Sequence, residues 1–152
     1  MTTEEKLQAL GLALPEPPQP VGNYRPAKRA GNLVFTSGQT ARLNGVRRYV
    51  GKVGVDVSEA DAYLSARDSA LNCLACVKWA VGDLALIESI VKLTGYVNSV
   101  DDFTSQPAVI NGASDLLEKL FGDAAPHART AISVNALPSN VSVEVEMIVL
   151  VR

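Results

Sequence analysis

Residues 130–151, TAISVNALPSNVSVEVEMIVLV, hold two apolar runs separated by Pro138-Ser139-Asn140, and this stretch decides the fold class. Both runs are rich in β-branched residues, so we expect strands over Thr130–Leu137 and Val141–Val151. The short link between them predicts an antiparallel hairpin. In that hairpin Arg129 and Glu144 share one sheet face but lie ~20 Å apart along the ladder, at ~3.3 Å per residue.

The second run alternates with a period of two, which gives its two faces different characters. Val143, Val145 and the later odd-numbered residues share one face, which we expect to be buried. Glu144 and Glu146 share the other face with Ile148 and Leu150. Two residues this apolar are not expected to remain in water, so a second copy of the chain is expected to cover this face. The two carboxylates either need a nearby donor or cation, or lie at the wet end of the strand.

Upstream of this stretch, the sequence predicts two long helices. Asp56–Val81 has an apolar stripe, a capping signal at Ser58 and a stop at Gly82. Phe103–Phe121 tolerates Pro107 because proline fits in a first helical turn. The remaining strands are expected at Lys28–Ala30, Leu33–Ser37 and Ile90–Val97, with a weaker one at Val46–Val50. This order predicts an α+β domain with one mixed sheet and both helices on one of its faces.

The first 22 residues are expected to form a short helix and an extended arm, ahead of a domain over residues 23–152. Thr3–Leu10 predicts the helix, with Thr3 as its N-cap and Gly11 at its end. Pro15-Glu16-Pro17-Pro18-Gln19-Pro20 can only be extended, because proline lacks the backbone donor that helices and central strands need. The arm is expected to lie across the body, the alternative being a ligand for a proline-reading domain.

Composition narrows the class of protein. The chain has 152 residues, 47% of them apolar, and a net charge of −2, as in a single globular domain. It shows neither a signal-peptide pattern nor a membrane-spanning run, so a cytoplasmic location with no membrane partner is expected. Residues 1–52 carry a charge of +5 and the remainder −7. The basic half predicts either a patch for phosphate or carboxylate, or a rim that pairs with an acidic surface; the overall balance disfavours nucleic acid.

Cys73 and Cys76 form a CxxC motif, and His127 is the only histidine. The motif lies inside the first long helix without a second CxxC or a histidine pair, so we interpret both cysteines as buried structural residues and expect no metal. His127 is interpreted as a loop side chain rather than a general base.

Several short motifs, taken together and in order, resemble the Rid family of imine deaminases, also called the YjgF family. They are Gly22-Asn23-Tyr24, Phe35-Thr36-Ser37-Gly38-Gln39, Asp102-Phe103, Asn111, His127-Ala128-Arg129-Thr130 and Val143-Glu144-Val145-Glu146.

The resemblance implies a chorismate-mutase-like fold, assembled as a homotrimer whose sheets line a central barrel. It implies hydrolysis of 2-imino acids and their enamine tautomers to 2-keto acids and ammonia, without a cofactor. Arg129 resembles the clamp for the substrate carboxylate, and Glu144 the group that activates water or moves a proton. Tyr24, Ser37, Gly38 and Asn111 resemble substrate-binding positions. Ala131 stands where the family often has cysteine, which excludes a thiol from that position. Two alternatives remain: a non-catalytic binder of small keto or imino acids, and an endoribonuclease.

Overall fold

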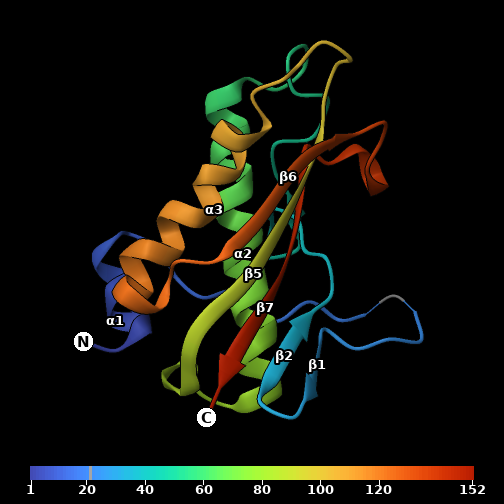
Figure 1. Ribbon diagram of the computed structural model, residues 1–152. Helices are drawn as coiled ribbons and strands as arrows, with labels where there is room; N and C mark the ends of the chain where they lie inside the picture. The colour runs from blue at the N-terminus through green and yellow to red at the C-terminus, as the bar shows by residue number, and fades with distance from the viewer. Residues whose placement is uncertain (21) are drawn as a thin grey trace.

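The computed structural model describes residues 1–20 and 22–152, and its centre is a five-stranded mixed sheet with the strand order β1-β2-β7-β5-β6. These strands are β1 (Ala27–Ala30), β2 (Leu33–Thr36), β5 (Ile87–Asn98), β6 (Ala128–Val134) and β7 (Val143–Val151). Helices α2 (Glu59–Val81) and α3 (Gln106–Phe121) cover one face and leave the other open (Figure 1). The α+β class and the helices on one face are confirmed.

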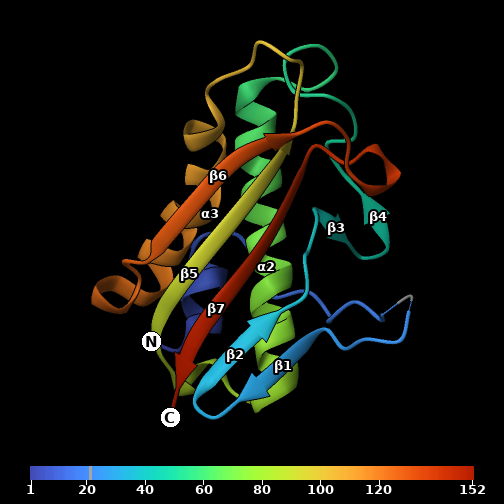
Figure 2. The ribbon, with the colours of Figure 1, turned by 45° about the vertical axis from the view of Figure 1, so that its right-hand side comes forward.

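The strand pairing contradicts the predicted hairpin. β6 pairs with β5 in parallel, and β7 pairs with β5 and β2 antiparallel, so β5 lies between β6 and β7 (Figure 2). The reason is the β5-α3-β6 unit: a helical crossover brings the chain back beside the start of β5, which makes the next strand parallel.

Residues 135–142 must therefore pass around the end of β5 rather than form a tight turn. The side chain of Asn98, the last residue of β5, donates to Asn140 Oδ1 and to the Val141 carbonyl at 3.0 and 3.1 Å. Lys52 Nζ donates to the Asn135 carbonyl at 2.7 Å and holds the other end of this segment.

The core lies between the helices and the sheet. The odd-numbered residues of β7 from Val143 to Val151 are buried, and the even-numbered ones between them are only partly buried, which confirms the predicted alternation. Gly112 of α3 makes a close helix–helix contact, because a Cβ there would lie 1.9 Å from the carbonyl oxygen of Tyr63 in α2. Gly95 similarly makes room for Ile110.

The open face carries exposed apolar side chains. Phe35 of β2 and Ile132 of β6 are 40% and 45% exposed, and Ile148 and Leu150 lie between them on β7. A single chain therefore leaves this face without a covering layer.

The N-terminal helix is part of the same body. α1 (Thr3–Ala9) buries Leu7 completely, and Lys6 Nζ donates to the Leu120 carbonyl at the end of α3. Its N-cap is Thr2, not Thr3, because Thr2 and Glu5 form a reciprocal capping box. Residues 12–20 form neither helix nor strand, in agreement with the interpretation of the proline-rich segment as an arm without regular structure.

The remaining elements differ from expectation mainly at their ends. α2 begins at Glu59 with Ser58 as the N-cap, α3 begins at Gln106, and β5 extends the predicted strand in both directions. The weak strand expected at Val46–Val50 is shorter: β4 (Val46–Arg47) pairs only with β3 (Arg42–Leu43), in a small ribbon outside the main sheet.

Candidate functional site

Glu144 lies on the open face of the sheet, against the backbone of Gly38. A Cβ on Gly38 would be 2.6 Å from Glu144 Oε2, so any other residue here would displace the carboxylate. Reciprocal backbone hydrogen bonds between Gln39 and Val145, of 2.8 and 2.9 Å, hold the segment after β2 against β7. The structure thus brings together two of the predicted site residues and gives the physical reason for glycine at position 38.

The environment of Glu144 favours its protonated form. Burial is the larger cause of its raised pKa, and the neighbouring negative charge of Glu146 is the second. Glu146 accepts a 2.9 Å hydrogen bond from the hydroxyl of Tyr96. A carboxyl group with a raised pKa can both take up and release a proton closer to neutral pH, as a general acid–base catalyst must.

Ser37 and Tyr24 lie near this glycine. The Ser37 hydroxyl donates to the Arg25 carbonyl at 2.6 Å, so in this structure it holds the chain that enters β1. Tyr24 is about half exposed and lines a cavity that also includes Gly38. Among the described residues, this cavity is lined by Tyr24 and Gly38 but not by Ser37 or Glu144, so only Gly38 links it to the carboxylate.

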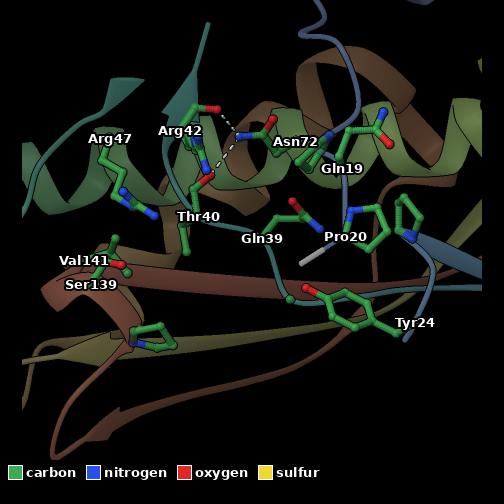
Figure 3. Close-up of a pocket in the computed structure, with 14 residues that line it drawn as sticks. Gln19, Pro20, Tyr24, Gln39, Thr40, Arg42, Arg47, Asn72, Ser139 and Val141 are labelled. Carbon is green, nitrogen blue, oxygen red and sulfur yellow. Dashed lines mark hydrogen bonds between the residues drawn. The ribbon is translucent and has the colours of Figure 1, made fainter. Parts of the chain in front are cut away.

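The cavity beside Gly38 has a volume of about 170 Å³, smaller than the ~300–1,000 Å³ of drug-sized pockets and suited to a small metabolite. Figure 3 shows Arg42 and Arg47 on one side of it and Tyr24 on the other. The buried side chain of Asn72, on α2, donates to the backbone carbonyls of Thr40 and Arg42, both at 2.8 Å. These two bonds fix the backbone that forms the cavity wall.

Arg129 occupies a different place. It is paired with the buried Leu93 in the β5–β6 ladder, so it lies on the sheet face that the helices cover. Its guanidinium donates to Asn111 Oδ1 at 2.7 Å and to Ser114 Oγ at 3.2 Å, both on α3. The predicted pair Arg129 and Asn111 is therefore in direct contact.

A histidine extends this network. Ser114 Oγ lies 3.0 Å from His127 Nε2, and His127 Nδ1 lies 2.6 Å from the Ala125 carbonyl. The carbonyl can only accept, so Nδ1 carries the proton in the neutral ring and Nε2 accepts from Ser114. His127 lies in the loop before β6, which confirms the interpretation of His127 as a loop side chain. Through its hydrogen bond it orients Ser114, which in turn contacts Arg129.

Within one chain, Arg129 and Glu144 lie on opposite faces of the sheet. Glu144 is paired with Tyr96, three residues from Leu93 on β5, and an odd separation along a strand reverses the face. The expectation that they share a face is wrong because it rested on the β6–β7 hairpin.

Cys73 and Cys76 are both free and buried in α2. Burial raises the pKa of Cys76 to about 12, and Cys73 donates to the Val145 carbonyl. Thiols so protonated are poor nucleophiles, which confirms their structural interpretation. Across residues 1–20 and 22–152, no group of three or more His, Cys, Asp or Glu side chains is placed to hold a metal ion. In the same residues no helix is long and apolar enough to cross a membrane.

Sequence reasoning missed the specific placement of Arg42, Arg47, Asn72 and Ser114. The dipeptide Asn44-Gly45 was a usable signal, because it favours a tight hairpin that sets Arg42 opposite Arg47. Asn72 and Ser114 had no such signal, since a polar residue within an amphipathic helix does not reveal its tertiary partner.

Comparisons with known proteins agree with this architecture. Residues 4–150 match the family described as "YjgF/chorismate mutase-like, putative endoribonuclease". Protein TCP17 of Trypanosoma cruzi is 36% identical, with 94% of this chain and 90% of that protein covered. The 2-iminobutanoate/2-iminopropanoate deaminase of Escherichia coli K12 is 31% identical over 93% of this chain and 97% of its own.

A solved structure extends the similarity. The crystal structure of Atu1372, a protein of unknown function from Agrobacterium tumefaciens, superposes with a TM-score of 0.94 at 42% identity. It covers 99% of this chain, including the N-terminal helix and arm, and 92% of its own. The chain belongs to the YjgF/chorismate mutase-like family, the Rid family that its sequence motifs indicated.

Proposed function

We propose that this chain is a cytoplasmic, cofactor-independent hydrolase that converts small 2-imino acids and their enamine tautomers to 2-keto acids and ammonia. The observation that carries the proposal is the contact between Glu144 and Gly38: a carboxyl group of raised pKa has room because position 38 is glycine, and that glycine lines a small cavity. Relatives named 2-iminobutanoate/2-iminopropanoate deaminase support the substrate class.

The chemistry requires few groups. The imine carbon is already electrophilic, so Glu144 needs only to take a proton from water as the oxygen bonds to that carbon. The same carboxyl returns that proton to nitrogen, which gives a tetrahedral carbinolamine. It then takes the hydroxyl proton of the carbinolamine and passes it to the nitrogen, so that ammonia leaves as the carbon–nitrogen bond breaks and the carbonyl forms. Arg129 binds the substrate carboxylate, since a guanidinium offers two parallel donors and remains charged.

We further propose that the complete site forms between chains. Arg129 and Glu144 cannot meet across their own sheet, so one substrate between them requires a second copy. The exposed apolar face around Ile148, Leu150 and Phe35 provides a surface for that copy. A homotrimer with the sheets facing a central barrel is the assembly that the family resemblance implies.

A non-catalytic binder of keto or imino acids would use the same cavity and the same arginine. Binding without turnover distinguishes it from an enzyme. The endoribonuclease in the family description finds less support here, because the net charge is −2 and a strand of RNA needs a wide basic surface.

The test is a coupled assay. A pyridoxal-phosphate dehydratase acting on serine or threonine releases 2-aminoacrylate or its homologue, and keto-acid formation is followed with and without this protein. We expect acceleration that increases with protein concentration and is absent with Glu144→Gln. Lys119→Gln, which changes an exposed residue near the end of α3, serves as the matched control. If wild-type protein binds 2-oxobutanoate but accelerates no imine, the binder interpretation replaces the enzyme.

A further inference from the structure

Arg42 and Arg47 are exposed residues that lie opposite each other on the β3–β4 ribbon, and neither forms an ion pair with a described residue. They are direct cross-strand partners, and like charges in that arrangement destabilise a ribbon. Within residues 1–20 and 22–152, the ion pairs of the chain involve other cations: Arg48, Arg67, Lys78 and Arg152. The two guanidinium groups are therefore left with an unfavourable interaction that a bound anion would relieve.

Both arginines line the cavity beside Gly38, and none of its other described lining residues is acidic. Gln39, Thr40 and Ser139 add neutral polar groups to its wall. Glu16 lines an adjoining cavity that Arg42 also borders, but within the part of the chain that the structure describes Glu16 forms no ion pair. A concave site with two arginines and no carboxylate concentrates anions.

The cavity is also built to keep its shape. The two hydrogen bonds from buried Asn72 fix the carbonyls of Thr40 and Arg42, so the backbone that carries one arginine is anchored to α2. The ribbon turn at Asn44 and Gly45 has both residues at positive φ, a tight turn that keeps Arg47 opposite Arg42.

Gly38 connects this cavity to the proposed catalytic carboxyl group, because it lines the cavity and contacts Glu144. We propose that Arg42 and Arg47 form a second anion subsite, which binds the distal carboxylate of a dicarboxylic 2-imino acid. The proposal rests on the proposed function and specifies its substrate class: imines of acidic amino acids. The volume of about 170 Å³ is sufficient for a carboxylate on a short chain.

The test is direct binding of stable keto-acid products, measured by calorimetry on the intact wild-type protein, and so does not depend on turnover. The probes are 2-oxoglutarate, 2-oxobutanoate and inorganic phosphate. We expect 2-oxoglutarate to bind about tenfold or more tightly than 2-oxobutanoate, as one added charge-assisted contact predicts. In Arg42→Gln and Arg47→Gln this ratio is expected to fall to about one, while Lys119→Gln, on exposed α3 surface, retains it.

A second readout covers folding. Arg47→Gln removes one of two facing positive charges, so its melting temperature should be equal to or above that of wild type. Added 2-oxoglutarate should raise the melting temperature of wild type more than it raises that of the variant. Equal affinities for 2-oxoglutarate and 2-oxobutanoate in wild type, or an unaltered ratio in both variants, would overturn the subsite. Phosphate binding that matches 2-oxoglutarate and is lost in both variants would assign the pocket to phosphate instead. If the binding ratio holds while no imine is hydrolysed, the subsite stands and the catalytic proposal fails.

Discussion

At the scale of single residues, Gly38 and Glu144 form the contact on which the proposed chemistry depends. The sequence places a glycine two residues after the end of β2, which indicates a close approach, but it does not identify the group approached. That group is 106 positions away on β7, and only the pairing of Gln39 with Val145 defines it. Arg129 and Asn111 were selected by resemblance, and their 2.7 Å contact was not derivable from either residue alone.

Arg129→Lys should lower kcat/KM for imine hydrolysis on the order of a hundredfold, because lysine keeps the charge but loses the paired donors. The substitution also removes the contacts to Asn111 and Ser114. The coupled assay measures this effect, and circular dichroism checks the fold. Arg29→Lys, on exposed β1, is the matched control and should retain wild-type rates. Near-wild-type turnover by Arg129→Lys would show that Arg129 does not bind the substrate carboxylate through paired donors.

Glu144→Gln should make the protein more stable near neutral pH. The pKa of Glu144 is raised above its ordinary 4.5, so the folded chain holds this proton more tightly than the unfolded chain. The stability linked to this group is present below pH 4.5 and is lost as the pH rises through the folded pKa. Thermal melts across this range should show the variant above wild type at neutral pH and the two converging in acid. If wild type is more stable than Glu144→Gln near neutral pH, the folded protein favours the charged form of Glu144 and the expected direction is wrong.

Helices were more predictable than strand pairing at the scale of elements. The capping signal at Ser58 and the stop at Gly82 lie at the ends of α2, because caps act through local backbone groups. β6 and β7 were expected as a hairpin, and their separation by β5 follows from a crossover that no local signal encodes. The error mattered for the site, since it placed Arg129 and Glu144 on the same face.

Gly112→Ala should destabilise the domain by about 3 kcal/mol, because the new Cβ would lie 1.9 Å from the Tyr63 carbonyl and push α2 and α3 apart. The sign of the change in the free energy of unfolding distinguishes the two cases, because a glycine-to-alanine change at a helix position with free space around it stabilises by ~1 kcal/mol. Urea unfolding measures the difference. A neutral or stabilising result would mean that the helices do not touch here.

Replacing both Cys73 and Cys76 with alanine should cost about 1 kcal/mol at each position and leave imine hydrolysis unaltered. Each change removes only a small buried group from α2. Chemical denaturation and the coupled assay measure the two effects. Loss of activity with the fold intact would give the CxxC motif a chemical role.

The open sheet face is the feature that matters most for the whole molecule. The pattern of Ile148 and Leu150 beside two glutamates predicted an uncovered apolar face, and the structure shows that neither helix covers it. What the sequence of one chain leaves undefined is how copies meet, because that depends on the shape of the whole face rather than on any motif.

Mixing two inactive variants tests the central claim, that hydrolysis uses Arg129 of one chain and Glu144 of another. Arg129→Ala and Glu144→Ala proteins are dissociated together, reassembled, and verified as mixed oligomers by mass spectrometry. In a cyclic assembly with one site per interface, roughly one interface in four then carries both intact residues. The account predicts recovery of about a quarter of wild-type activity, with none in either variant reassembled alone. Verified mixed oligomers that remain inactive would contradict it.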